Sequence, residues 1–207
     1  MIVDNFDLVG DIVFDKEPLM NDGEHFHIVK IVARAKDIKC RAFTYINYFC
    51  QSKEHLMSLK DKIVKLCDTY HARAYISVNP LSIKTYTKSL IKKLTEVVEE
   101  NKNYLLPFLY NSPEYNEAVN ENKRRWEVDL DNVRGEKAAQ PMIDEVKRTM
   151  IEGGEVFLIP TSTGSHLLTD HFNKEEFWKK FPEFRITENP PTLLYYGFAP
   201  DMPEEEN

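Results

Sequence analysis

Residues 125–131 read Arg-Trp-Glu-Val-Asp-Leu-Asp, and this stretch decides how the second half of the chain folds. Its three acids are Glu127, Asp129 and Asp131, and the apolar residues between them are Val128 and Leu130. A period of two is typical of a β-strand with one buried face, because successive side chains point to opposite sides. The stretch therefore predicts a strand with a core on one side and three carboxylates on the other.

The elements around this strand follow from similar patterns. Downstream, a helix is expected from about Pro141 to Ile151, where proline favours the first helical position. Strands at 155–159, 166–169 and 192–196 and a short helix at 174–180 complete the second half. Upstream, the patterns predict strands at 26–34, 41–49 and 73–78 and helices at 53–69 and 82–100, with Ser52 as an N-cap. The sequence therefore predicts a mixed α/β (α+β) fold.

The composition narrows the class of protein. The chain has 207 residues, 42% of them hydrophobic, enough for a substantial core. Its seven glycines allow neither a GxGxxG nor a GxxxxGK[ST] loop, which disfavours Rossmann dinucleotide binding and P-loop chemistry. Three cysteines without a CxxC pair favour a reducing environment. No stretch has the length of a membrane span and the start lacks a signal-peptide pattern, so we expect a cytoplasmic protein without a membrane partner.

Charge is distributed in blocks along the chain. Its net charge is −7, yet residues 30–93 hold 14 Lys and Arg against 4 Asp and Glu. A basic block of this length favours a phosphate-rich partner such as nucleic acid, or else it only keeps two amphipathic helices soluble. We therefore expect four segments: an acidic, extended N-terminal arm (1–25), a basic α/β subdomain (26–110), a second module (111–200) and an acidic tail (201–207).

A second motif lies between two predicted strands. Residues 161–166 read Thr-Ser-Thr-Gly-Ser-His. Small residues such as Thr163, Gly164 and Ser165 let a backbone approach a ligand, and exposed N–H groups can hold an anion. His166 would then donate a hydrogen bond to a phosphate. The alternative is an ordinary hairpin whose hydroxyl groups cap the turn.

Together the two motifs resemble the catalytic core of the archaeo-eukaryotic primase (primase-polymerase) superfamily. Val128-Asp129-Leu130-Asp131 matches its hydrophobic-Asp-hydrophobic-Asp motif, and residues 161–168 are similar to its Ser-Gly-x-Gly-x-His motif. The resemblance implies an RRM-like module with a mixed or antiparallel sheet in residues 111–200. The order of features over residues 28–200 also resembles small phage proteins, which implies the host cytoplasm.

The resemblance also implies roles for particular residues. Asp129 and Asp131 would hold Mg²⁺ or Mn²⁺, with Glu127 as a substitute ligand. His166 would contact the triphosphate of an incoming nucleotide, in a pocket shaped by Thr163, Gly164 and Ser165. The family has a third acidic motif, expected here near 192–196, and that stretch contains no carboxylate.

The implied function is that of a minimal primase or primase-polymerase, a nucleotidyltransferase that acts on a single-stranded template. Two alternatives use the same residues. One is a catalytically degenerate protein that binds nucleic acid or nucleotides as a replication or host-takeover accessory, and the other is a metal-dependent nuclease. Template contacts are expected in the basic half, at Arg73, Asn79, Lys84 and Lys88.

Overall fold

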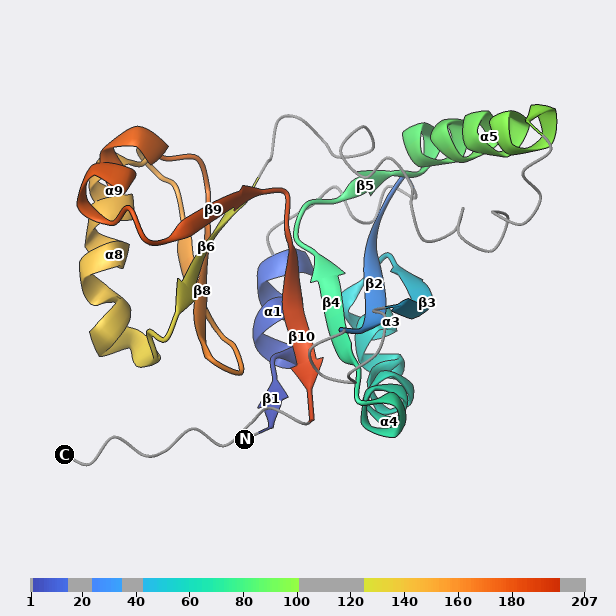
Figure 1. The fold of residues 1–207 in the computed structure, drawn as a ribbon, viewed down its shortest axis with the longest axis horizontal. Coiled ribbons are helices and arrows are strands. Elements are labelled where there is room, and N and C mark those ends of the chain that lie inside the picture. Colours follow the sequence, from blue (N-terminus) through green and yellow to red (C-terminus); the bar gives the residue numbers. More distant parts are fainter. Residues whose placement is uncertain (1, 15–23, 35–42, 101–124, 198–207) are drawn as a thin grey trace.

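The computed structural model describes residues 2–14, 24–34, 43–100 and 125–197. Within these ranges the chain forms six helices and two antiparallel sheets, one of six strands and one of four (Figure 1). This confirms the mixed α/β class. In the same ranges no helix is both long enough and apolar enough to cross a membrane.

The first sheet is built from the N-terminal half of the chain and its last strand. Its path is β1-β10-β4-β2-β3, with β5 paired to β2. The bounds are β1 Val3–Asp4, β2 His25–Ala33, β3 Phe43–Cys50, β4 Arg73–Ser77, β5 Leu81–Ser82 and β10 Pro191–Tyr196. The strand expected at residues 192–196 was assigned to the second module. In the structure it is β10, which lies between β1 and β4 in the first sheet.

Three helices cover the inner face of this sheet: α1 (Phe6–Phe14), α3 (Lys53–Ser58) and α4 (Lys60–Tyr70). The Ser52 side chain caps α3 by accepting a hydrogen bond from the backbone N of His55 at 3.1 Å, as predicted. The expected single helix at 53–69 is divided at Leu59. The buried core between sheet and helices includes Phe6, Val9, Val13, Val29, Ile31, Leu56, Ile63, Ala74, Ile76 and Leu194.

The N-terminal arm was predicted to be extended, and this is wrong for residues 6–14. They form α1, which lies between the two sheets (Figure 1). Just before α1, the Asn5 amide donates to the carbonyls of Pro160 in β7 and Leu193 in β10, both at 2.9 Å. The acidic composition concealed a helical spacing of apolar residues, and burial of that apolar side outweighs the charge on the other.

The second sheet has the order β7-β8-β6-β9. Its elements, in chain order, are β6 Trp126–Asp131, α8 Gly135–Thr149, β7 Val156–Pro160, β8 Gly164–Thr169, α9 Lys174–Lys180 and β9 Arg185–Glu188. This βαββαβ connectivity, with the first and third strands at the centre, is the ferredoxin-like arrangement that RRM-type modules share. The expected antiparallel sheet is therefore present. The helix α8 begins six residues before Pro141, and β9 falls in a stretch predicted to be a loop.

The two faces of the second sheet have different neighbours. One face packs against α8 and α9 through a core that includes Val128, Leu130, Val146, Leu167 and Phe177. On the opposite face, Ile159 and Leu168 join the core around α1. The carboxylates of β6 lie on this opposite face, where Glu127 is directly opposite Leu168.

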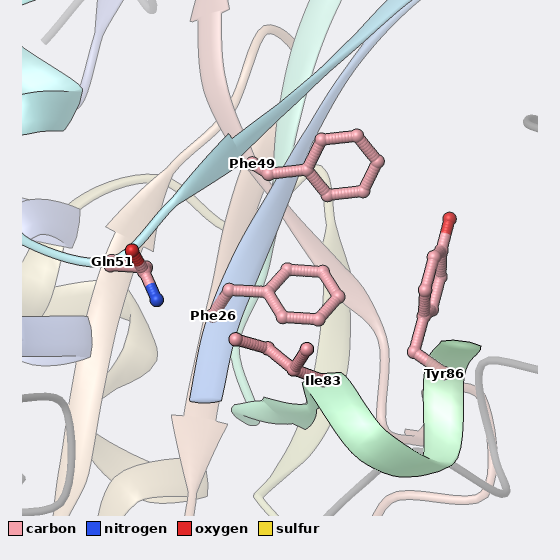
Figure 2. A pocket seen from close by; sticks show the side chains of 5 residues that line it. All are labelled: Phe26, Phe49, Gln51, Ile83 and Tyr86. Atoms are coloured by element: carbon pink, nitrogen blue, oxygen red, sulfur yellow. The ribbon is translucent and has the colours of Figure 1, made fainter. Parts of the chain in front are cut away.

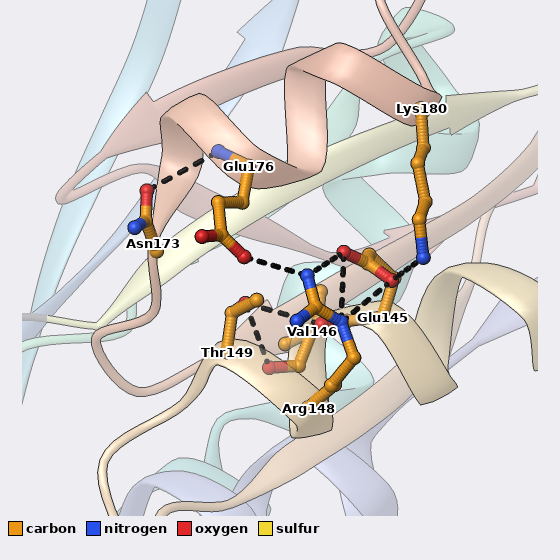
Figure 3. A network of polar contacts seen from close by, with 7 residues as sticks. All are labelled: Glu145, Val146, Arg148, Thr149, Asn173, Glu176 and Lys180. Atoms are coloured by element: carbon orange, nitrogen blue, oxygen red, sulfur yellow. Dashed lines mark hydrogen bonds and ion pairs between the residues drawn. The ribbon is translucent and has the colours of Figure 1, made fainter.

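An ionic network joins α8 to α9 (Figure 3). Glu145 is 4% exposed and contacts both Arg148, at 2.6 Å, and Lys180. Arg148 also reaches Glu176 at 2.6 Å. The hydrogen bonds from Arg148 and Lys180 lower the pKa of Glu145 to about 2. The network therefore fixes one helix against the other on the side of the sheet away from the carboxylates.

The buried residue His27 is expected to make the stability of the fold depend on pH. Its side chain is fully buried, and its Nδ1 lies 2.7 Å from the Ser77 carbonyl oxygen. Burial lowers the pKa of His27 from 6.5 to about 4, although the Ser77 hydrogen bond acts in the opposite direction. The unfolded chain therefore binds the proton first as pH falls. We expect the free energy of unfolding to drop by up to about 3 kcal/mol between about pH 6.5 and pH 4.

Urea denaturation at several pH values measures this effect. A His27→Gln variant is expected to have a flatter profile in that window, whatever its stability at pH 7.5. His55→Gln, which alters an exposed histidine of α3, is the control and should keep the wild-type slope. An unchanged slope in His27→Gln would contradict the assignment.

Candidate functional site

The carboxylates and the imidazole of the two motifs meet on one face of the second sheet. β6 pairs with β8 so that Asp129 lies directly opposite His166, and it pairs with β9 so that Asp129 lies opposite Arg185. Directly opposed residues of antiparallel strands share a face. The face therefore carries a row of three ionisable residues, His166, Asp129 and Arg185.

The alternating pattern of β6 produces this arrangement. Val128 and Leu130 are fully buried against α8 and α9, and they fix the register of the strand relative to its core. Glu127, Asp129 and Asp131 must then project from the other face. They differ in exposure, since Glu127 is buried, Asp129 is half-buried and Asp131 is exposed.

Glu127 holds the imidazole of His166. The Glu127 Oε2 atom lies 2.9 Å from His166 Nδ1, whereas the Asp129 Oδ1 atom is 3.7 Å from His166 Nε2, too far for a hydrogen bond. Burial alone would lower the pKa of His166, but its close contact with Glu127 and the negative charges of Glu127, Asp129 and Asp131 outweigh burial and raise the pKa. The ring is thus oriented with Nε2 toward Asp129.

Asp129 occupies the centre of the row. Burial raises the pKa of its carboxyl, and the charges of Asp131 and Glu127 add to this effect, against the opposing influence of His166 and Arg185. Asp131 receives a hydrogen bond from Thr163 Oγ1 at 3.4 Å. The charged form of Asp129 is therefore disfavoured relative to that of a fully solvated aspartate.

The turn between β7 and β8 is a closed hairpin. Thr161 N donates to the Gly164 carbonyl at 3.0 Å, and Gly164 N donates to Thr161 Oγ1 at 3.1 Å. The Gly164 amide thus bonds within the turn. Ser165 pairs with Leu130 and is 2% exposed, so it lies on the face of α8, opposite to His166. Of the expected pocket residues 163–166, the structure brings Thr163 and His166 to the carboxylates, and Ser165 lies away from them.

Gly164 serves the packing of β8 against β6. A β-carbon at this position would collide with the Leu130 carbonyl oxygen and lie 2.9 Å from Asn132 N. A Gly164→Ala variant is expected to lose about 1–3 kcal/mol of stability, because backbone atoms cannot move aside as a side chain can. Urea midpoints measure the loss, with Thr163→Ala at the same hairpin as control. Equal midpoints for Gly164→Ala and wild type would show that the strands separate without cost.

The carboxylates of this face could hold a divalent ion only if a bound phosphate group supplied further ligands to it. Among the described residues, no three His, Cys, Asp or Glu side chains are grouped to hold an ion. Glu127, expected as a ligand, is engaged with His166 instead. Asp129 and Asp131 remain, and Mg²⁺ is commonly held by one or two carboxylates together with substrate phosphates and water. The two aspartates fit a metal that arrives with a phosphate group.

The expected template contacts in the basic half divide into two groups. Arg73 is 6% exposed, with its guanidinium 4.1 Å from the centre of the Tyr196 ring. Asn79 is 1% exposed and bonds to the backbone of Arg125. The burial of both side chains argues against the predicted template contacts at these two positions. Lys84 and Lys88 are exposed on α5 (Ile83–Glu99), one turn apart, and they remain candidates.

Arg185 was missed because β9 was not expected. The strand has four residues and follows two aromatic residues and a proline, so its pattern resembles a loop. Once β9 is paired with β6, Arg185 is fixed opposite Asp129. Arg185 and His166 lie on strands at opposite sides of β6, and the spacing of residues in the sequence does not indicate that both flank Asp129.

Comparison with known proteins gives no match: no protein-family model, no curated protein and no solved structure is similar to this chain. What the site does must therefore be inferred from its own residues.

Proposed function

We propose that the face formed by Asp129, Asp131, His166 and Arg185 binds the phosphates of a nucleotide and supports nucleotidyl transfer on a single-stranded template. The observation that carries the proposal is the pairing of Asp129 with His166 across the two central strands of a βαββαβ module. On this face a carboxylate pair could bind a cation, and the imidazole could donate a hydrogen bond to a phosphate oxygen. The protein is then a minimal primase-like nucleotidyltransferase.

Each residue has a role that follows from its contacts. His166, held by Glu127 through Nδ1, presents Nε2–H to a phosphate oxygen placed near Asp129. The Arg185 guanidinium adds positive charge on the other side of Asp129. Asp129 and Asp131 would hold Mg²⁺ or Mn²⁺, which when bound neutralises charge on the phosphates and lowers the pKa of an attacking hydroxyl. The protein contributes mainly positioning and electrostatic stabilisation, as is usual for phosphoryl transfer.

A non-catalytic binder is the second candidate, and one observation favours it. The residue opposite Asp129 on β9 is Arg185, and the third carboxylate of this face, Glu127, contacts His166. A site with one free acid fewer than the primase-like motifs would supply, and with one more cation, retains affinity for phosphate. It loses part of the metal site on which catalysis depends.

A template-extension assay tests the proposal. The full chain is incubated with labelled NTPs or dNTPs, Mn²⁺ and a primed or unprimed single-stranded template, with and without EDTA. We expect extended products that EDTA abolishes. A gel shift of the template without extension would favour the non-catalytic binder, and shortening of the template would favour a nuclease.

Binding to the template should depend strongly on salt. If about four phosphates are contacted, affinity for a single strand falls roughly 50-fold between about 50 and 200 mM salt. Changing both Lys84 and Lys88 to Gln should reduce the slope, because these lysines are exposed on one side of α5. Lys147→Gln with Lys179→Gln, on α8 and α9, is the matched control. If the affinity of the wild type did not change with salt, the prediction that the basic residues 30–93 contact phosphates would be wrong.

A further inference from the structure

An aromatic cavity lies at the edge of the first sheet, away from the carboxylates. Its volume is about 300 Å³, and it is lined by Phe26, Phe49, Gln51, Ile83 and Tyr86. Phe26 and Phe49 project from the neighbouring strands β2 and β3 toward Ile83 and Tyr86 in the first turn of α5 (Figure 2). Most of the lining is apolar carbon, with one amide and one phenol.

The three rings form a cluster with one accessible member. The centres of Phe26 and Tyr86 are 5.2 Å apart, those of Phe26 and Phe49 5.4 Å, and those of Phe49 and Tyr86 5.9 Å, all with edge-to-face geometry. Phe26 and Tyr86 are buried, whereas Phe49 is 44% exposed. An exposed aromatic ring of this size is unfavourable in water, and the ring of Phe49 offers a flat surface on which another ring can stack.

Two polar groups accompany the rings. Tyr86 is 7% exposed, and its buried hydroxyl has no hydrogen-bond partner among the described residues. The Gln51 side chain is exposed at the other end of the cavity and reaches the His25 carbonyl at 3.4 Å. An apolar pocket with a few polar atoms at its rim is typical of a site for a planar heterocycle.

One lysine lies farther along the same face of the sheet. Phe26, Ile28 and Lys30 lie at alternate positions of β2 and so share its outer face, with Lys30 about 13 Å from Phe26 along the strand. A second cavity of about 160 Å³ adjoins there, lined by Ile28, Lys30, Ser77, Asn189 and Pro191. Burial lowers the pKa of Lys30, because its ammonium group is partly withdrawn from water.

We propose that the aromatic cavity binds an unpaired base of single-stranded nucleic acid, with the sugar-phosphate strand leaving it toward Lys30. Stacking on aromatic side chains beside a cationic track is how proteins hold single strands without reading their sequence. The inference rests on the proposed function for its partner class, and it assigns that partner a surface separate from the Asp129 face. The cavity would hold the template while the carboxylates act elsewhere on it.

Base-dependent binding tests the inference. The full chain is titrated into a fluorescent oligothymidylate and into an abasic oligomer of equal length and charge. We expect the wild type to bind the thymidylate at least fivefold more tightly than the abasic strand. Phe49→Ala should remove most of this preference while leaving the affinity for the abasic strand unchanged. Trp178→Ala, which truncates an aromatic residue 40% exposed on α9, is the matched control and should keep the preference.

Several results would overturn the inference. Equal affinity of the wild type for both oligomers would mean that no base enters the cavity. An undiminished preference in Phe49→Ala would place the base elsewhere. A dimer in solution that Phe49→Ala dissociates would mean that a second copy of the chain covers the rings. If template extension fails but the Phe49-dependent preference is observed, base binding by the cavity is supported and nucleotidyl transfer is not. If extension succeeds while the preference is absent, only the cavity assignment falls.

Discussion

An Asp129→Asn variant is expected to lose at least about 100-fold in metal-dependent nucleotide incorporation and yet fold normally. The amide has the size of the carboxylate, so the strand and its pairing with His166 should persist. What disappears is the negative charge at the centre of the row, and removing one such group from a preorganised site commonly costs about 10²–10³ in rate.

Stability separates this role from a structural one. Burial and the neighbouring acids raise the pKa of Asp129, so the charged form is disfavoured in the folded protein. Its neutral replacement should therefore be as stable as the wild type or more stable at neutral pH. Loss of activity without loss of stability is typical of a group kept for function.

The control removes a carboxylate from the opposite side of the module. Asp144 is exposed on α8, where it accepts a hydrogen bond from Gln140 at 2.7 Å. Asp144→Asn should leave incorporation within about twofold of the wild type, as measured by labelled-nucleotide extension. Wild-type activity in Asp129→Asn would end the proposal that this face is catalytic. Loss of template binding in the variant would point instead to a direct contact with nucleic acid.

Local signals in the sequence predicted the elements that depend on neighbours along the chain. The alternation at 125–131, the cap at Ser52 and the helix at 174–180 agree with β6, α3 and α9, because propensity, capping and burial act together there. The helix α1 was missed because acidic residues fill its exposed side. Its apolar positions Phe6, Val9 and Val13 have helical spacing and were available as a signal.

Part of the site followed from the motifs and part required the register. The juxtaposition of Asp129 and His166 was expected from the resemblance, whereas Glu127 as the partner of His166 was not. The position of Ser165 follows from strand parity alone, since neighbours in a strand face opposite ways, but the strand was expected to begin at His166. Arg185 depends on long-range pairing of a short edge strand, which local pattern does not encode.

Replacing Asn79 by Ala is expected to destabilise the whole protein by about 4 kcal/mol. Its side chain accepts a hydrogen bond from Arg125 N at 2.7 Å and donates to Arg125 O at 3.3 Å and to Asn189 Oδ1 at 2.6 Å. These atoms lie just before β6 and between β9 and β10, where the chain crosses between the two sheets. The variant leaves Arg125 N and Asn189 Oδ1 without this partner, each at a cost of about 1–3 kcal/mol, and it removes one of two donors to the Arg125 carbonyl.

The consequence should be loss of cooperativity as well as stability. Asn79 joins the connection between β4 and β5 to both segments that link the sheets, so its removal lets one sheet unfold before the other. Urea denaturation followed by tryptophan fluorescence, which reports the second sheet and α9 through Trp126 and Trp178, should separate from far-ultraviolet circular dichroism, which reports both. Asn173→Ala, which removes the cap of α9, is the control and should cost about 1 kcal/mol in a single transition. A template-binding role for Asn79 predicts the reverse: an unchanged urea midpoint with weakened binding to the single strand.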